Sequence, residues 1–216
     1  MIKNIFIILI LSSFNLQPSF ASCSNPTKAD TLLKNMFEKY QSSLKYSDKG
    51  HVYQTVNGTK YTKEFSTKFE APDKFTFMWK ETDPFNNELN INKIWGENKT
   101  AYYLQHYNEK PEKKGYNSVL SAASGVSGGI SYKVLPWLLL HHNPCITINV
   151  TKNSVLNKGN DQQNNSHIIQ RITKNGHIEN YWISKKTLLL TKVESKSSYQ
   201  GINSSTKITF DQVAFE

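Results

Sequence analysis

Residues 61–79 read YTKEFSTKFEAPDKFTFMW, and apolar and polar side chains alternate on both sides of a central break. One face of the two segments carries Phe65, Thr67, Phe69, Phe75, Phe77 and Trp79. A period of two residues is that of a half-buried β-strand, and Ala71-Pro72-Asp73 has the composition of a turn. The stretch therefore predicts two antiparallel strands that share an aromatic face.

The period of two residues continues along most of the chain after Gly50. Asn57-Gly58 is a strong hairpin signal, and Asn175-Gly176 and Lys185-Lys186 mark further turns. More strands are expected at residues 91–95, 100–105, 146–151, 167–173, 177–184, 188–198 and 206–215. The Asn-rich residues 157–166 are expected to form a solvated loop. The predicted fold is mainly β, a large antiparallel meander within one domain.

Helical segments are expected beside this sheet. From Pro26 onward, apolar residues recur at helical spacing, namely Ala29, Leu32, Leu33, Met36, Phe37, Tyr40 and Leu44. Residues 117–123 could form a short helix, and the glycine- and serine-rich residues 124–129 follow it. The most apolar segment, residues 132–140, contains Pro136 and is better explained by a short buried helix than by a strand. Such a helix must cover an apolar surface, and the segment before it could act as a hinge.

The start of the chain is typical of a secretory signal. Lys3 precedes the apolar run of residues 5–11, and small residues precede a cleavage point after Ala21. We expect residues 1–21 to be a signal peptide and residues 22–216 to be a single soluble periplasmic domain. The alternative is that residues 21–23 act as a lipobox and that Cys23 anchors a lipoprotein. No segment of the mature chain is long enough for a membrane span.

The two cysteines support opposite expectations. In an oxidising compartment, Cys23 and Cys145 would form a disulfide between the mature N-terminus and a distant segment. If Cys23 carries lipid instead, Cys145 is left as a free thiol.

Composition and motifs exclude several classes of function. The formal net charge is +9, but Arg171 is the only arginine, which argues against a nucleic-acid reader. The lysines are expected on solvated faces, with weak attraction to anionic lipid surfaces as the alternative. No catalytic motif or phosphate loop is evident, and the adjacent His141-His142 would point in different directions. We therefore expect no catalytic residue, no metal site and no cofactor.

The aromatic face of the predicted sheet is larger than one N-terminal helix can fill. Either the apolar helices fill it as an ordinary core, or they cover it loosely and leave a pocket for an apolar ligand. The candidate residues of such a cavity are Phe65, Phe69, Phe75, Phe77, Trp79, Trp137, Leu138 and Leu139.

Several short motifs are spread over nearly the whole mature chain, and their order along the sequence is informative. An N-terminal helix ends near Tyr46, and Gly50 opens the first strand. The later motifs are FEAPDKFTF at 69–77, IW at 94–95 with TAYY at 100–103, the glycine segment before LPWLL at 135–139, and YWISKKTLLL at 181–190. In this order the chain resembles the periplasmic lipoprotein-carrier (LolA-like) superfamily, and most of all an uncharacterised periplasmic branch of it.

The resemblance implies a strongly curved, unclosed antiparallel β-sheet, or half-barrel, with helices over its concave face. It also implies that the protein binds or carries lipids or lipoprotein acyl chains between the sheet and a helical lid. The expected partner is a lipid or an acylated lipoprotein, bound by a monomer. The alternative is a regulator or assembly factor that binds envelope proteins on the same fold, and a lipid hydrolase of the envelope is a third and more remote possibility.

Overall fold

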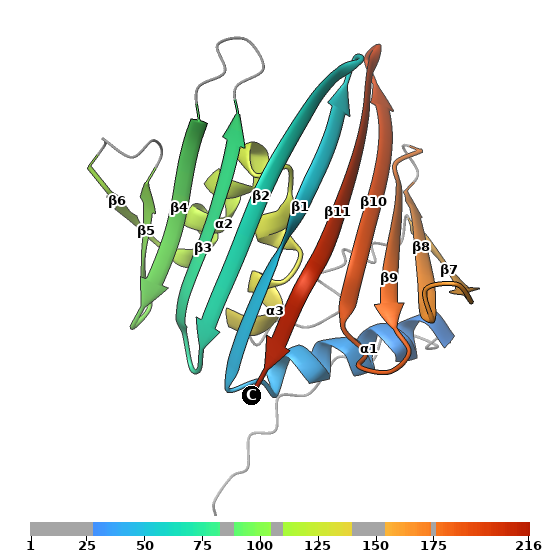
Figure 1. Cartoon of the computed structure of the whole chain (residues 1–216), viewed down its shortest axis with the longest axis horizontal. Helices are drawn as coiled ribbons and strands as arrows, with labels where there is room; N and C mark the ends of the chain where they lie inside the picture. Colours follow the sequence, from blue (N-terminus) through green and yellow to red (C-terminus); the bar gives the residue numbers. More distant parts are fainter. Residues whose placement is uncertain (1–27, 83–88, 105–109, 140–153, 174–175) are drawn as a thin grey trace, which may run out of the picture.

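A single open sheet and three α-helices make up the part of the chain that is described. The computed structural model describes residues 28–82, 89–104, 110–139, 154–173 and 176–216. All strands of the 11-stranded sheet pair antiparallel, and the helices lie on one side of it (Figure 1). The predicted signal peptide, Cys23, Cys145 and the predicted strand at 146–151 lie outside the described residues, so these remain predictions.

The strands run from one edge of the sheet to the other through a central pair made by the two ends of the domain. Their bounds are β1 Lys45–Val56, β2 Thr59–Glu70, β3 Lys74–Thr82, β4 Leu89–Glu97, β5 Thr100–Leu104, β6 Glu112–Lys114, β7 Ser154–Asp161, β8 Ser166–Thr173, β9 Ile178–Ser184, β10 Leu190–Tyr199 and β11 Ile202–Phe215. The spatial order is β6-β5-β4-β3-β2-β1-β11-β10-β9-β8-β7. Two meanders are therefore joined where β1 pairs with β11, and Tyr46 lies opposite Phe215.

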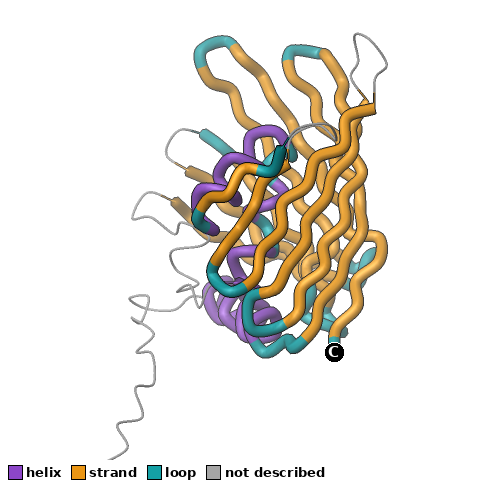
Figure 2. The backbone as a smooth tube through the Cα atoms, turned by 90° about the vertical axis from the view of Figure 1, so that its left-hand side faces the viewer, coloured by secondary structure: helices purple, strands orange, loops and turns teal. Residues whose placement is uncertain are grey.

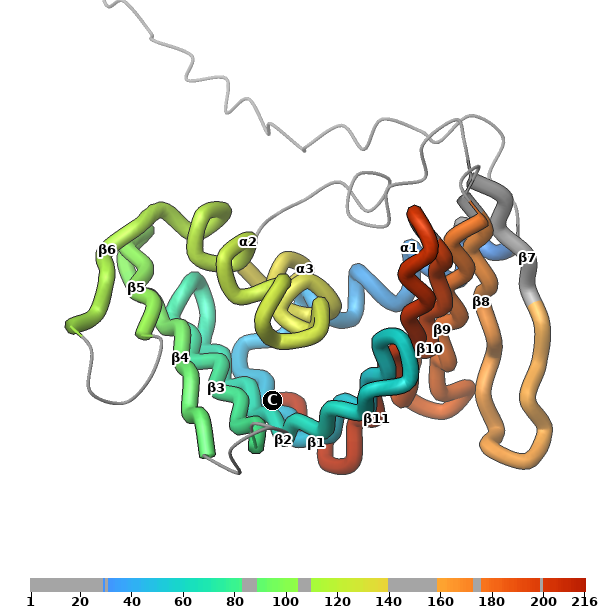
Figure 3. The backbone as a smooth tube through the Cα atoms, turned by 90° about the horizontal axis from the view of Figure 1, so that it is seen from above, coloured from blue at the N-terminus to red at the C-terminus, as the bar shows by residue number. Residues whose placement is uncertain are grey.

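The sheet is strongly curved and remains unclosed, as the resemblance implies. Seen from above, it bends into a trough that holds the helices α2 and α3 (Figure 3). From the side, the helices lie against one face and leave the other face uncovered (Figure 2). The helices are α1 Lys28–Gln41, α2 Tyr116–Val126 and α3 Leu135–Leu139, with a 3₁₀ turn, η1, at Ile130–Tyr132.

The turn signals are confirmed where the structure describes them. Asn57 and Gly58 connect β1 to β2 with φ angles of 47° and 87°, the left-handed values that a tight hairpin requires. Lys185-Lys186 lie in the turn after β9, and residues 71–73 separate β2 from β3.

Three expectations about local structure were wrong. Residues 157–161 are not part of a loop, because β7 extends through Asp161 and pairs with β8 through its backbone, and only residues 162–165 form a turn. Leu44 does not belong to the helix, which ends at Gln41, and its side chain is 69% exposed. Gly50 does not open the first strand, because β1 begins at Lys45.

Gly50 has a different structural role, in the middle of β1. A Cβ atom at this position would lie 1.9 Å from the Thr209 carbonyl oxygen and 2.6 Å from the Phe65 ring. The β1–β11 register also shifts between Lys49 and Gly50. A glycine here therefore lets a bulged strand pass close to its neighbour at the centre of the sheet.

Helix α1 forms because its apolar residues share one side, and that side is buried. The buried residues are Ala29, Leu32, Leu33, Met36, Phe37 and Tyr40. The Tyr40 hydroxyl accepts a hydrogen bond of 3.1 Å from the Leu190 backbone N–H. The helix is thus tied to β10 by a polar contact as well as by packing.

Candidate functional site: the concave face and its helical cover

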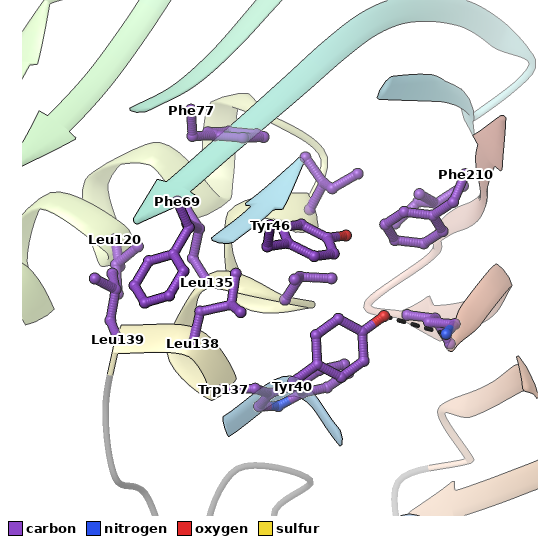
Figure 4. Packing of buried hydrophobic residues seen from close by; sticks show 14 of the residues in the cluster. Tyr40, Tyr46, Phe69, Phe77, Leu120, Leu135, Trp137, Leu138, Leu139 and Phe210 are labelled. Carbon is purple, nitrogen blue, oxygen red and sulfur yellow. Dashed lines mark hydrogen bonds between the residues drawn. The ribbon is translucent and has the colours of Figure 1, made fainter. Parts of the chain in front are cut away.

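The eight predicted cavity residues all lie in one packed cluster. Phe65 and Phe69 come from β2, Phe75, Phe77 and Trp79 come from β3, and Trp137, Leu138 and Leu139 come from α3. Each is at most 7% exposed, and each belongs to the apolar cluster between the sheet and the helices. Figure 4 shows Phe69 of the sheet directed toward Leu138, Leu139 and Leu120 of the helices. The structure therefore brings all eight residues together in one cluster.

The segment from α2 through η1 to α3, residues 116–139, is called the helical cover here. Its buried side includes Val119, Leu120 and Ala123 of α2 and every residue of α3. Trp137 packs edge-on against Phe37 and Tyr40 of α1, with ring centroids 4.9 and 5.2 Å apart. The helical cover thus contacts both the sheet and α1 through apolar side chains.

The sheet side of the cluster contains a stack of three rings. Phe77 and Trp79 are stacked with centroids 5.4 Å apart, and Trp79 and Tyr103 are stacked with centroids 6.3 Å apart. Aromatic residues bury large areas, so this stack contributes much of the apolar packing on the concave side of β3 and β5.

Two indole nitrogens in this cluster have no hydrogen-bond acceptor among the described residues. They are Nε1 of Trp79, which is fully buried, and Nε1 of Trp137, which is 3% exposed. A buried N–H without an acceptor costs about 1–3 kcal/mol. The concave face therefore offers two unpaired donors among mainly apolar side chains.

Polar contacts hold α2, the first helix of the helical cover, to the sheet at both of its ends. At the start of α2, the Tyr116 hydroxyl donates to Asp73 Oδ2 at 3.1 Å and accepts from the Lys99 N–H at 3.1 Å. At the end of α2, the Lys63 ammonium donates to the Val126 carbonyl at 2.5 Å. Helix α2 is thus fixed to two turns of the sheet and to β2.

The third contact is a buried charge cluster that joins Lys133, directly after η1, to β8 and β9. Glu179 is 5% exposed and pairs with Lys133 at 2.6 Å and with Arg171, while the Tyr181 hydroxyl donates to it at 2.7 Å. Burial alone would raise the pKa of Glu179, but hydrogen bonds and charges from His177, Lys133 and Arg171 outweigh it and hold the pKa well below its ordinary value.

The same cluster also shifts the pKa values of Lys133 and Tyr181. Burial would lower the pKa of Lys133, but Tyr181 and Glu179 raise it above its ordinary value. Burial also raises the pKa of Tyr181 to about 12. The ammonium and the carboxylate are thus ionised at neutral pH, and the helical cover is anchored to the sheet by charge.

A buried carboxylate lies under the centre of the sheet. Asp48 is 3% exposed, and the Tyr46 hydroxyl donates to its Oδ2 at 2.5 Å. Burial raises the pKa of Asp48 to about 6, although hydrogen bonds from Thr67 and Tyr46 act in the opposite direction.

The sequence interpretation missed these polar residues of the concave face. Lys63 could have been recognised as buried from the sequence. It lies between Tyr61 and Phe65 on the same face of β2, the face that is predicted to be buried. Arg171 and Glu179 lie on β8 and β9, far along the chain from Lys133. No local sequence pattern links the three residues.

Two general features of the described residues bear on function. None of the helices within the described ranges is both long and apolar enough to cross a membrane. The same ranges hold no group of three or more His, Cys, Asp or Glu side chains arranged to hold a metal ion.

No protein-family model matches the sequence, and no curated protein matches it significantly. Among solved structures, a DUF1329 family protein from Desulfovibrio piger matches with a TM-score of 0.42 and 12% identity over 86% of this chain and 91% of that one. A LolA superfamily protein from Nitrosomonas europaea matches with a TM-score of 0.38 and 7% identity over 88% and 94% of the two chains. A chain of the Pseudomonas aeruginosa MucA/MucB complex matches with a TM-score of 0.46 and 11% identity over 88% and 57%. The LolA-like superfamily that the sequence motifs resemble is thus represented among the structural neighbours.

Proposed function

We propose that the protein is exported and binds lipids or the acyl chains of lipoproteins between the concave face of the sheet and the helical cover. The observation that carries this proposal is the pair of buried indole N–H groups of Trp79 and Trp137, which lack acceptors among the described residues. An ordinary core leaves few such donors, because buried polar groups are nearly always paired.

The chemistry of an acyl ligand fits these donors. The ester or amide carbonyl at the head of an acyl chain is a hydrogen-bond acceptor, and the rest of the chain is apolar. Each buried methylene contributes ~0.8 kcal/mol, so a long chain gains on the order of 10 kcal/mol before the costs of association. The aromatic and aliphatic side chains of the cluster supply the surface that such a chain needs.

Access requires the helical cover to move, and its attachment is compatible with motion. Besides these polar contacts, the cover packs on the sheet and α1 through apolar side chains. Gly128 and Gly129 separate α2 from η1 with φ angles of 73° and 84°. Such positions can absorb backbone rotation, so α2 can swing away from the sheet, with α3 still near α1, once the contacts of Tyr116 and Lys63 break.

The first test is to purify the protein from the envelope of its own cell, extract it with organic solvent and identify the extract by mass spectrometry. We expect a lipid or an acylated peptide in stoichiometric amount. A protein that is repeatedly empty would contradict the carrier function. Recovery of a bound unacylated protein segment would support the regulator alternative instead.

A second test uses matched tryptophan variants and a fluorescent acyl ester. Trp79→Phe and Trp137→Phe keep an aromatic ring but remove the N–H, so each is expected to weaken binding by about two- to tenfold, the value of one hydrogen bond. Trp182→Phe is the control, because its N–H already donates to Asp161 at 3.1 Å. Equal affinity of all three variants and the wild type would contradict the role of the buried donors.

The same variants separate a binding role from a structural one. Because the Trp79 and Trp137 N–H groups have no acceptor among the described residues, their removal should leave the thermal midpoint of unfolding unchanged or higher. A large loss of stability with unchanged affinity would show that these residues only support the core.

A further inference from the structure

The outer face of the sheet carries a second hollow, on the side away from the helical cover. It lies over β2 to β5, encloses about 500 Å³ and is lined chiefly by Lys68, Met78, Ile91, Lys93, Trp95 and Leu104. We name it the outer groove. The uncovered face of an antiparallel sheet is normally polar, so four half-buried apolar side chains in one hollow are unusual there.

The strand register explains why these side chains lie together. Met78 of β3 lies opposite Lys93 of β4, and Lys93 lies opposite Leu104 of β5. Directly opposed side chains of one face are neighbours, about 5 Å apart at Cβ. The floor of the outer groove is therefore a continuous row across three strands.

A flat aromatic wall borders this row. Trp95 and the opposing Tyr102 are stacked, with ring centroids 5.4 Å apart and planes inclined by 18°. The Lys93 ammonium lies 4.8 Å from the centroid of the Trp95 ring. The cation is thus held at the groove by a cation–π contact.

The charge in the outer groove has one sign. Lys68 and Lys93 are its charged lining residues, and no carboxylate of the described chain lines it. The apolar side chains of Met78, Ile91 and Leu104, an aromatic wall and two ammonium groups are complementary to a molecule with an apolar body and an anionic head.

We propose that the outer groove binds single molecules of an anionic amphiphile. The apolar part lies on Met78, Ile91 and Leu104 and against Trp95, and the anionic group lies between the two lysines. Pockets for small molecules span about 300–1,000 Å³, so a hollow of about 500 Å³ suits one molecule rather than a bilayer surface. This site is on the opposite face from the proposed acyl site and does not depend on it.

The test is isothermal titration of the purified protein with dodecyl phosphate below its micelle concentration. We expect saturable binding that Lys68→Gln combined with Lys93→Gln weakens about tenfold, because charge-assisted contacts to the anion are lost. Trp95→Ala should weaken it as well. Dodecyl maltoside has the same chain without the charge and is expected to bind about tenfold more weakly than dodecyl phosphate.

The matched control is Lys49→Gln combined with Lys60→Gln, which removes the same charge from exposed positions of β1 and β2 outside the groove. This control should bind dodecyl phosphate like the wild type. Equal weakening in both double variants, or unchanged affinity in the groove variants, would overturn the proposal. Binding only to anionic vesicles, and not to the single amphiphile, would overturn it too.

Discussion

Replacement of Asp48 by Asn should stabilise the protein at neutral pH and not in acid. Asp48 is 3% exposed, and burial raises its pKa from 3.8 to about 6. A pKa that is higher in the folded state means that folding favours the protonated acid. The folded protein therefore loses stability as the pH rises from about 4 to about 6, and remains less stable above that window.

The magnitude follows from the shift. A rise from 3.8 to about 6 at ~1.4 kcal/mol per pKa unit corresponds to ~3 kcal/mol of destabilisation at pH 7 and above. Asn is uncharged, so the variant does not incur this cost. Its side-chain oxygen can still accept the hydrogen bond that the Tyr46 hydroxyl donates at 2.5 Å.

The assay is urea unfolding of the wild type and of Asp48→Asn at a series of pH values from 4 to 8. We expect the variant to be more stable by up to ~3 kcal/mol at pH 8 and the difference to shrink toward zero near pH 4. Glu64→Gln, which removes an exposed carboxylate of β2, controls for the change in net charge. A stability difference that does not vary with pH would refute the reasoning.

Three further predictions concern the buried Glu179, the close approach at Gly50 and the contact between Lys63 and α2. Glu179→Gln should destabilise the fold by about 3–5 kcal/mol in urea unfolding, because it leaves buried cations without their carboxylate, and a loss below ~1 kcal/mol would contradict this. Gly50→Ala should cost more than about 3 kcal/mol in thermal unfolding because its Cβ would overlap the Thr209 carbonyl, whereas Gly115→Ala, with no atom within 4 Å, should be nearly neutral. Lys63→Met removes the hydrogen bond to the end of α2 and should speed amide exchange in α2 but not in α1; equal rates in wild type and variant would count against this anchor.

The sheet was predictable because its side chains follow a local rule. Apolar and polar residues largely alternate on both sides of the break at residues 71–73, and the Asn57-Gly58 signal places the preceding hairpin, so β1 to β3 can be derived from neighbours in the sequence. The pairing of β1 with β11 cannot, because it joins segments about 150 residues apart that carry no mutual signal. Strand β7 was missed because an edge strand can be polar throughout and is held by the backbone hydrogen bonds of one neighbour.

The candidate site was predictable in its apolar part and not in its polar part. Alternate residues of a strand share one face, so Phe77 and Trp79 could be assigned to the buried face of β3 from the sequence alone. The salt bridge between Lys133 and Glu179 connects the helical cover to β9, and its members look like ordinary surface residues in the sequence. Tertiary structure, and not local pattern, decides which charged residues are buried.

The most direct test of an acyl site under the helical cover is photo-crosslinking with an acyl ester that carries a diazirine in its chain. After illumination and digestion, mass spectrometry locates the modified residues. We expect modification of concave-face residues such as Phe77 and Trp79 and of the facing Leu138 and Leu139 on α3. Modification confined to outer-face residues such as Met78 and Trp95 would contradict the account.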